Sequence, residues 1–217
     1  MTIGGDDTNG AARKMYEKYK IPVIGFPKTI DNDLRTRTMH HYQGKSYETV
    51  LCPGFASGAM QIKKLTAKLH TTNESHQRIM VLEVMGRDAG WLTGSASFGG
   101  AQISLVPEVE MTKERKERFF EFVKEKYHTS PTKSLIIAVA EGVRWWNDEK
   151  GELGMVYASS DLDEYGHPRF GGISGVIASE INKKLGIEAR GQISGYIPRS
   201  GRCYEYDRRL TSTLADK

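Results

Sequence analysis

The stretch IMVLEVMGRDAG, residues 79–90, decides the fold of this chain. It begins with an apolar run of strand length, Ile79–Met85, and passes directly into a loop with two glycines and an arginine. Three other apolar runs read as buried strands: Ile21–Phe26, Leu135–Ala140 and roughly Gly191–Ile197. Helical patterns lie between them, and strands that alternate with helices predict an α/β fold with a largely parallel sheet.

Two of the intervening helices have recognisable boundaries. Thr112 is the expected N-cap of a helix that turns four apolar residues inward: Phe119, Phe122, Val123 and Tyr127. Gly186 is the expected glycine just beyond the end of another helix. Residues 35–53 show no clear period, so a long loop is expected there.

Composition excludes several classes of protein. The 217 residues are 38% hydrophobic and 27% charged, as in ordinary globular proteins. The net charge of +4 is modest and the basic residues are spread out, which does not predict a nucleic-acid binder. Cys52 and Cys203 lie too far apart in sequence to indicate a zinc site or a disulfide framework. No apolar run is long enough to span a bilayer, so no membrane association is expected and a cytoplasmic location is the default.

Polar side chains follow the apolar runs, where ligands bind in open α/β sheets. They are Lys28, Asp31 and Asp33 after the first run, Arg87 after the second, Glu141 after the third, and Tyr196 and Arg199 at the fourth. Together they describe a site for a charged ligand with many hydroxyl groups. The alternative for each residue taken alone is a turn or capping role.

The residue types favour a sugar phosphate. Arg78, Arg87, Arg190 and Arg199 lie near expected strand ends, and arginine forms bidentate hydrogen bonds with phosphate oxygens. Glu141 is suited instead to accepting hydrogen bonds from sugar hydroxyls. The small residues of GGDDTNG, residues 4–10, allow the backbone to approach a second phosphate group.

Phosphoryl transfer needs an aspartate that accepts the proton of the attacking hydroxyl and cations that spread the transition-state charge. Asp31 is the candidate for the proton-accepting aspartate, and Lys28, three residues before it, is a candidate for the cation. Asp6 or Asp7 is the candidate anchor for Mg²⁺.

Eight motifs occur in the order found in phosphofructokinases, and the resemblance covers nearly the whole chain. They are GGDDTNG, PKTIDND, ESHQR, EVMGRDAGW, VPE, AEG, EYGHPRFGG and GYIPRSG. The resemblance implies two Rossmann-like lobes: a donor-phosphate lobe from residues 1–52 with 198–217, and a fructose 6-phosphate lobe from residues 53–197. It also implies a homo-oligomer, a dimer or a tetramer.

The resemblance assigns a role to each matching residue. Asp31 would accept the proton of the sugar's 1-hydroxyl, Asp33 would support metal and phosphate, and Asp6 would hold Mg²⁺. Gly4, Gly5, Asp7 and Lys28 would meet the donor. The residues that would line fructose 6-phosphate are Thr29, Ile30, Asp31, Met85, Gly86, Arg87, Glu141, Tyr196 and Arg199. Arg78 and Arg190 are similar to the arginines that reach a neighbouring subunit's 6-phosphate.

Two positions bear on the phosphoryl donor. In ATP-using members glycine is typical at the position of Asp7, where a carboxylate obstructs the nucleotide's α-phosphate. Lys28 stands where classical ATP enzymes carry glycine, and its charge suits pyrophosphate. The pair resembles the pyrophosphate-dependent branch.

The family's N-terminal third and C-terminal helices have no counterpart in these 217 residues, so this chain is expected to be a fragment with little or no turnover alone. An ATP-dependent phosphofructokinase and a non-catalytic chain that binds sugar phosphates remain the alternatives. A dinucleotide-dependent oxidoreductase is disfavoured, because no G-x-G-x-x-G follows an expected strand.

Overall fold

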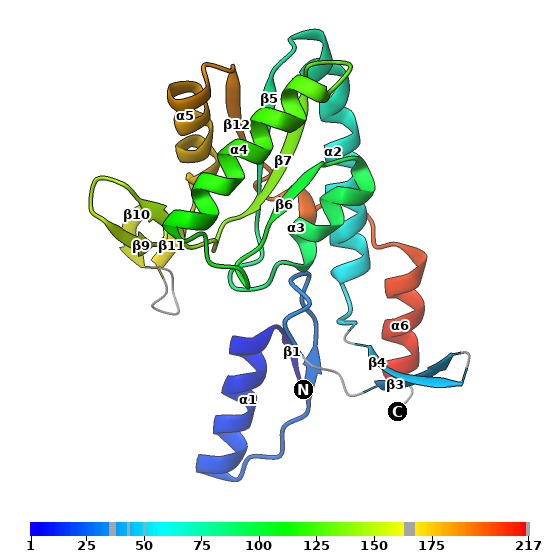
Figure 1. Cartoon of the computed structure of the whole chain (residues 1–217). Helices are drawn as coiled ribbons and strands as arrows, with labels where there is room; N and C mark the ends of the chain where they lie inside the picture. The colour runs from blue at the N-terminus through cyan, green and yellow to red at the C-terminus, as the bar shows by residue number, and fades with distance from the viewer. Residues whose placement is uncertain (35–37, 43, 50, 163–167, 216–217) are drawn as a thin grey trace. The chain divides into compact units, whose positions relative to one another are not determined.

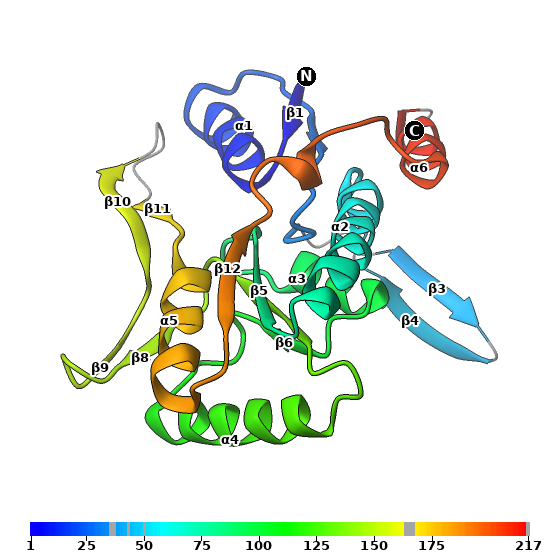
Figure 2. The same cartoon turned by 90° about the horizontal axis from the view of Figure 1, so that it is seen from above.

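A computed structural model of the chain describes residues 1–34, 38–42, 44–49, 51–162 and 168–215 (Figures 1 and 2). Its α-helices are α1 (Asp6–Tyr19), α2 (Phe55–Ser75), α3 (Trp91–Ser95), α4 (Lys113–Thr129), α5 (Ile173–Leu185) and α6 (Glu205–Ala215). Its strands are β1 (Thr2–Gly4), β2 (Gly25–Pro27), β3 (Thr38–Tyr42), β4 (Lys45–Thr49), β5 (Ile79–Val84), β6 (Ile103–Leu105), β7 (Leu135–Ala140), β8 (Trp145–Asn147), β9 (Glu152–Gly154), β10 (Tyr157–Leu162), β11 (Pro168–Phe170) and β12 (Ala189–Ile193). The short 3₁₀ helices are η1 (Ala96–Gly99) and η2 (Ile197–Arg199).

The chain forms two compact units. The first comprises Met1–Gly58 with Arg199–Lys217, and the second comprises Ala59–Pro198. Sequence motifs placed the boundaries at residues 52/53 and 197/198. In the structure the first turn of α2 falls in the first unit, so the long helix begins in one unit and continues in the other.

The second unit is built on a parallel sheet of four strands in the order β12-β5-β7-β6, which confirms the predicted α/β class. Helices α4 and α5 cover one face of this sheet, and α2 and α3 cover the other (Figures 1 and 2). Every residue of β5 and β7 is buried as a result. Parallel strands covered on both faces read as continuous apolar runs rather than alternating ones, which is why the sequence pattern marked them.

The predicted inward face of α4 is correct in part. The side chain of Thr112 accepts a hydrogen bond from the N–H of Arg115 at 3.5 Å, which confirms the N-cap. Phe119 and Val123 are buried as expected. Phe122 is 43% exposed, however, and Phe120 is buried in its place. Trp145 packs edge-on against the ring of Phe119, and this contact selects the helix face that points inward.

The first unit contains a smaller parallel pair, β1 and β2, beside α1. The prediction of a buried strand over Ile21–Phe26 is wrong. Strand β2 covers only Gly25–Pro27, and Ile21 and Ile24 are 44% and 73% exposed. Pro22 has no N–H for a strand ladder, and β1 is the partner that the described residues give β2.

The expected loop at residues 35–53 contains an antiparallel hairpin. Strands β3 and β4 pair with Thr38 opposite Thr49, and Gly44 between them has a φ of +71°, a left-handed turn conformation that suits glycine. Residues 35–37, 43 and 50 lie outside the described residues, as do residues 164–167 of the EYGHPRFGG motif.

The end of α5 and the next strand also test the sequence reading. Gly186 ends α5 with a φ of +65°, and its N–H bonds to the carbonyl oxygen of Asn182, which confirms the predicted glycine cap. The strand that follows is Ala189–Ile193 rather than Gly191–Ile197. Tyr196 therefore lies beyond the strand, not within it.

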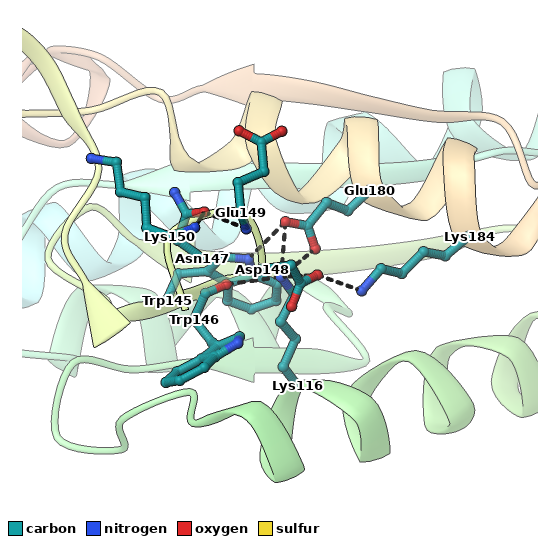
Figure 3. Close-up of polar contacts among 9 residues, drawn as sticks. All are labelled: Lys116, Trp145, Trp146, Asn147, Asp148, Glu149, Lys150, Glu180 and Lys184. Atoms are coloured by element: carbon teal, nitrogen blue, oxygen red, sulfur yellow. Dashed lines mark hydrogen bonds and ion pairs between the residues drawn. The ribbon is translucent and has the colours of Figure 1, made fainter. Parts of the chain in front are cut away.

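A cluster of charges around the buried Lys116 joins three elements of the second unit (Figure 3). The side chain of Lys116 on α4 is 1% exposed, and its ammonium group contacts Glu180 on α5 at 2.8 Å and Asp148 at 3.1 Å. The same ammonium group donates to the carbonyl oxygen of Trp146 and lies 5.3 Å from the centre of the Trp145 ring. Hydrogen bonds from Lys184, and then from Lys116, hold the pKa of Asp148 below its usual value. The cluster therefore fastens α4 and α5 to the β8–β9 hairpin.

In the part of the chain that the structure describes, no helix is long and apolar enough to cross a membrane.

Candidate active site

The first unit brings the predicted donor residues together at the carboxyl ends of β1 and β2. The N–H of Lys28 donates a 2.8 Å hydrogen bond to the carbonyl oxygen of Gly4. Gly5 is the N-cap of α1, and a Cβ added there would contact the side chain of Thr29 at 3.7 Å. Asp6 and Asp7 form the first turn of α1. This corner combines a helix N-terminus, which favours anions, with the carboxyl ends of parallel strands.

Gly4 is required by close packing in this corner. A Cβ at Gly4 would lie 2.3 Å from the Oγ1 of Thr8, a distance that would force the helix away from the strand. Because residue 4 has no Cβ, the end of β1 can lie in close contact with Thr8 near the start of α1. The small residues singled out in GGDDTNG serve a tight turn from strand to helix, the geometry in which backbone groups approach phosphate.

The metal prediction rests on Asp6. Among the described residues no group of three or more His, Cys, Asp or Glu side chains is placed to hold a metal ion. Mg²⁺ retains several waters and is commonly held by one or two carboxylates together with substrate phosphates. The exposed carboxylate of Asp6 fits that mode of binding and does not fit an all-protein metal cage.

The loop that follows β2 carries the candidate base. The N–H of Asp31 donates to the Oγ1 of Thr29 at 3.1 Å, and Asp31 is half-buried. Asn32 is buried with a φ of +58°, a conformation that asparagine tolerates better than most residues. Asp33 is exposed, whereas Ile30 is 8% exposed. The loop is a defined turn and presents Asp31 and Asp33 in different environments.

The second unit contributes the loop of residues 85–90. One carboxylate oxygen of Glu141 accepts hydrogen bonds from the N–H groups of Gly86 and Arg87, both at 3.1 Å. The sequence reading gave Glu141 a role toward sugar hydroxyls. The structure gives it a second one, because its Oε1 ties the end of β7 to the loop after β5.

Arg87 is held in an unusual backbone conformation. Its φ is +47°, and a Cβ at Gly142 would lie 2.0 Å from its carbonyl oxygen. A left-handed conformation at a non-glycine residue costs roughly 1–2 kcal/mol, and such residues cluster at functional sites. The surrounding contacts impose this conformation, and the conformation sets the direction of the Cα–Cβ bond of Arg87. Gly86 has a φ of +145°, so the turn from Met85 into Arg87 also depends on a glycine.

A further carboxylate supports the same loop. The N–H of Gly90 donates to the Oε1 of Glu108 at 2.8 Å, and a Cβ at Gly90 would clash with Val106 at 2.5 Å. Glu108 belongs to the VPE motif, to which the sequence reading assigned no role. The loop is thus held at its start by Glu141 and at its end by Glu108.

Arg78 and Arg190 lie at the other end of the same sheet. Arg78 directly precedes β5 and Arg190 is the second residue of β12, so both are at the amino ends of strands. Both contact Glu188, with Arg78 at 3.6 Å and Arg190 at 3.0 Å. The Nε of Arg78 is buried, and the described residues give it no hydrogen-bond partner. The sheet therefore separates this arginine pair from Arg87 and Glu141, at the carboxyl ends.

Tyr196 and Arg199 follow β12 toward the boundary between the units. Tyr196 is 79% exposed, and Arg199 ends η2 as the first residue of the segment that belongs to the first unit. The structure describes each half of the predicted site within its own unit: the donor and base residues in the first, and the Arg87–Glu141 loop in the second.

Two buried carboxylates were missed in the sequence. Glu83, inside the apolar run of β5, accepts hydrogen bonds from the N–H groups of Gly172 and Ser174 at the start of α5. Asp207 on α6 accepts from Gly54 and Ser57 at the start of α2. For Glu83 the signal was a charge within a strand of apolar residues. Asp207 has no comparable signal, because its partners are 150 or more positions away in sequence.

Comparison with known proteins identifies the family of the chain. The family model described as phosphofructokinase matches residues 1–217. A pyrophosphate–fructose 6-phosphate 1-phosphotransferase from Streptomyces coelicolor is 37% identical over 213 residues, covering 98% of this chain and 56% of the relative. An ATP-dependent 6-phosphofructokinase 2 from the same organism is also 37% identical, over 218 residues, covering 97% and 55%. The chain spans about half the length of these curated relatives.

Solved structures show the same fold. A pyrophosphate-dependent phosphofructokinase from Marinobacter aquaeolei has a TM-score of 0.68 at 23% identity, with 99% of this chain and 51% of that chain covered. Phosphofructokinase from Saccharomyces cerevisiae also has a TM-score of 0.68, at 22% identity, with 97% and 26% covered. The family match along the whole chain and the identity to full relatives lead to one conclusion. The chain belongs to the phosphofructokinase family.

Proposed function

We propose that these residues serve phosphoryl transfer from pyrophosphate to the 1-hydroxyl of fructose 6-phosphate, a reversible reaction that gives fructose 1,6-bisphosphate. The observation that carries the proposal is the corner where the hydrogen bond from Lys28 to Gly4 joins two segments. It sets Lys28 beside the helix start that bears Asp7, and the loop with Asp31 follows directly. Relatives of both donor types have similar identity to this chain, so the choice of donor rests on these residues.

The charges at this corner discriminate between donors. A nucleotide adds an α-phosphate and a nucleoside to the two phosphates that pyrophosphate presents. The carboxylate of Asp7 repels that additional phosphate and occupies its space, whereas the ammonium group of Lys28 attracts a compact polyanion. Pyrophosphate is the donor that this pair favours.

The proposed reaction is a direct displacement. The 1-hydroxyl oxygen attacks the terminal phosphorus of pyrophosphate, a new O–P bond forms, and the bridging O–P bond breaks to release phosphate. Asp31 takes the hydroxyl proton, and Lys28 offsets negative charge on the phosphoryl group in transit. Asp6 would hold Mg²⁺ through one carboxylate, and Asp33, two residues after Asp31, would support the metal and phosphate; when bound, this ion neutralises charge on the donor phosphates.

The residues proposed for the sugar phosphate are those that the resemblance to phosphofructokinases assigns to it. Thr29, Ile30 and Asp31 come from the first unit, and Met85, Gly86, Arg87 and Glu141 come from the second. Tyr196 and Arg199 would complete this set. Because Arg78 and Arg190 lie at the opposite end of their sheet, we infer that they serve the 6-phosphate of a neighbouring subunit, in a dimer or a tetramer.

A second candidate function is ATP-dependent phosphorylation of the same sugar. The specific observation in its favour is the 37% identity to ATP-dependent relatives from Streptomyces coelicolor and Corynebacterium efficiens. A non-catalytic chain that binds sugar phosphates is the alternative from another class. Such a chain would use Arg87 and Glu141 but would have no need of Asp31.

Calorimetry can separate these functions without turnover. The purified chain is titrated with pyrophosphate, with ATP and with fructose 6-phosphate, each in the presence of Mg²⁺. We expect pyrophosphate to bind at least about tenfold more tightly than ATP, a difference of 1.4 kcal/mol. Tighter binding of ATP than of pyrophosphate would overturn the choice of donor. Because little or no turnover is expected of these 217 residues alone, product formation followed by ³¹P NMR tests the reaction in a full-length context, with Asp31→Asn as the variant that should abolish it.

A further inference from the structure

We infer that Asp207 is a positioning residue for Asp31, acting from helix α6 through the start of helix α2. The inference rests on the proposed function for its catalytic meaning, because Asp31 is the base only under that proposal. The carboxylate of Asp207 accepts hydrogen bonds from residues 150 or more positions away, and Asp207 belongs to none of the motifs recognised in the sequence.

The first step is the docking of the Asp31 loop on residues 52–54. The N–H of Thr29 donates to the carbonyl oxygen of Pro53 at 3.1 Å, and the N–H of Cys52 donates to the Oδ1 of Asn32 at 2.9 Å. These two contacts bracket Asp31 on both sides. The position of Asp31 is therefore set by the position of the backbone at residues 52–54.

The second step is the close approach at Gly54. Thr29 and Gly54 form a parallel β-bridge, and Gly54 has a φ of +107°, which only glycine adopts readily. A Cβ at Gly54 would lie 3.3 Å from the carbonyl oxygen of Thr29. Movement of Gly54 is thus transmitted to Thr29 by direct backbone contact.

The third step is the set of hydrogen bonds that the carboxylate of Asp207 accepts from residues 54–57. Its Oδ1 accepts from the N–H of Gly54 at 3.0 Å, and its Oδ2 accepts from the N–H of Ser57 at 2.7 Å. The hydroxyl of Ser57 also donates to Oδ2, and the N–H of Tyr204 donates to that same hydroxyl oxygen. Asp207 is 3% exposed. One buried carboxylate therefore holds three donors at the start of α2, and charge-assisted bonds of this kind are the stronger ones.

The consequence is a continuous set of contacts within the first unit. Asp207 holds Gly54 and Ser57, Gly54 abuts Thr29, and the Oγ1 of Thr29 accepts the N–H of Asp31. Helix α6 thereby participates in the geometry of the reaction without touching a substrate. Loss of the carboxylate should loosen the Asp31 loop more than it loosens the rest of the fold.

The test is amide hydrogen exchange resolved by NMR on the whole chain. Asp207→Asn replaces one acceptor oxygen with an NH₂ group that faces donors, so Gly54 or Ser57 loses its partner. We expect the amides of Thr29, Asp31 and Cys52 to exchange at least about tenfold faster, while those of β5 and β7 change little. Ser57→Ala keeps the carboxylate and both backbone bonds, so the same amides should accelerate to a smaller degree. Should Asp207→Asn fail to fold, the exchange rates of these amides in Ser57→Ala test the inference instead.

The matched control is Lys116→Met. It also disrupts a buried, multiply bonded charge, but in the second unit, whereas Asp207 and the Asp31 loop belong to the first. Loop amides that exchange at the unsubstituted rate in Asp207→Asn, or equally fast in Lys116→Met, would overturn the inference. If Asp207→Asn is unfolded, an unchanged exchange rate in Ser57→Ala would do the same.

Turnover provides a separate readout. In a full-length context, with fructose 6-phosphate and pyrophosphate, Asp207→Asn should lower kcat by about tenfold and change KM for the sugar less, because the base is displaced while Met85, Gly86, Arg87 and Glu141 are not. An unchanged kcat in the folded variant would contradict the inference. Absence of turnover in the unsubstituted full-length context bears on the proposed function alone, since the exchange experiment needs no catalysis.

Discussion

The N–H of Arg87 donates a 3.1 Å hydrogen bond to the carboxylate of Glu141, and this contact joins the loop after β5 to the end of β7. The same oxygen accepts from Gly86, so one carboxylate sets the start of the loop. Arg87 consequently keeps a left-handed backbone that an unconstrained arginine would avoid. The sheet thus imposes a strained conformation on the residue that we propose binds the sugar phosphate.

Replacing Arg87 with glycine should separate stability from binding. Glycine adopts a φ of +47° without strain, so we expect the free energy of unfolding to stay within about 1 kcal/mol of the unsubstituted protein. Affinity for fructose 6-phosphate should fall at least about tenfold, because charge-assisted hydrogen bonds are lost. Urea unfolding and calorimetry measure the two quantities. Arg87→Lys serves as the control and should retain part of the affinity; unchanged affinity in Arg87→Gly would remove Arg87 from the site.

Substitution at Gly142 should be severely destabilising. A Cβ at this position would lie 2.0 Å from the carbonyl oxygen of Arg87, a backbone atom that cannot rotate away. We expect Gly142→Ala to lower the free energy of unfolding by about 2–4 kcal/mol, which urea unfolding measures. The matched control is Gly175→Ala in α5, where an added Cβ meets no atom of the described residues within 4 Å. That change should raise stability by about 0.5–1 kcal/mol through helix propensity. Similar stability of the two variants would show that the backbone at Arg87 moves to accommodate the added Cβ.

The choice of donor should respond to Asp7. Asp7→Gly removes the charge and bulk that oppose a nucleotide. The affinity for ATP should therefore rise by about tenfold, and the ratio of pyrophosphate affinity to ATP affinity should fall by about tenfold. Titration calorimetry with both ligands measures the change. Glu17→Gln, at the other end of α1, removes one carboxylate from the same helix and should alter neither affinity. An unaltered preference in Asp7→Gly would show that Asp7 does not select the donor.

The charge cluster around Lys116 should make part of the stability depend on pH. Hydrogen bonds from Lys184 and Lys116 lower the pKa of Asp148 in the folded protein, so its ionised form stabilises the fold. This contribution is fully present above the unfolded-state pKa of about 3.9 and is lost as pH falls through the lower folded value. The difference in melting temperature between the unsubstituted protein and Asp148→Asn should therefore be constant near neutral pH and shrink below about pH 4. A constant difference down to about pH 2 would contradict this assignment.

The most predictable parts of the fold were those whose cause lies within a few residues. Strand β7 was delimited correctly because six consecutive apolar residues suit a strand covered on both faces. The cap at Thr112 and the terminal glycine of α5 were predictable for the same reason, since each depends on the nearest turn of helix. The hairpin of β3 and β4 was not predicted, because its cross-strand pairing leaves no simple period in residues 35–53.

The site was predictable in its residue types and only partly in its contacts. The motif order indicated Lys28, Asp31, Arg87 and Glu141, but it did not reveal that Glu141 holds the backbone of Arg87. It also did not indicate that Arg78 and Arg190 lie at the amino ends of their strands, because a residue near a strand in sequence can stand at either end.

Short-range sequence patterns thus specified the family, the central strands and the residues able to handle phosphate, because side-chain chemistry and local backbone preference act over a few positions. Contacts between distant segments specified the rest: the register of parallel strands, the face of α4 that is buried, and the carboxylates that hold the loops. Asp207 illustrates the reason. Its hydrogen bonds to Gly54 and Ser57 span 150 or more positions, and only the packing of α6 beside the start of α2 creates them.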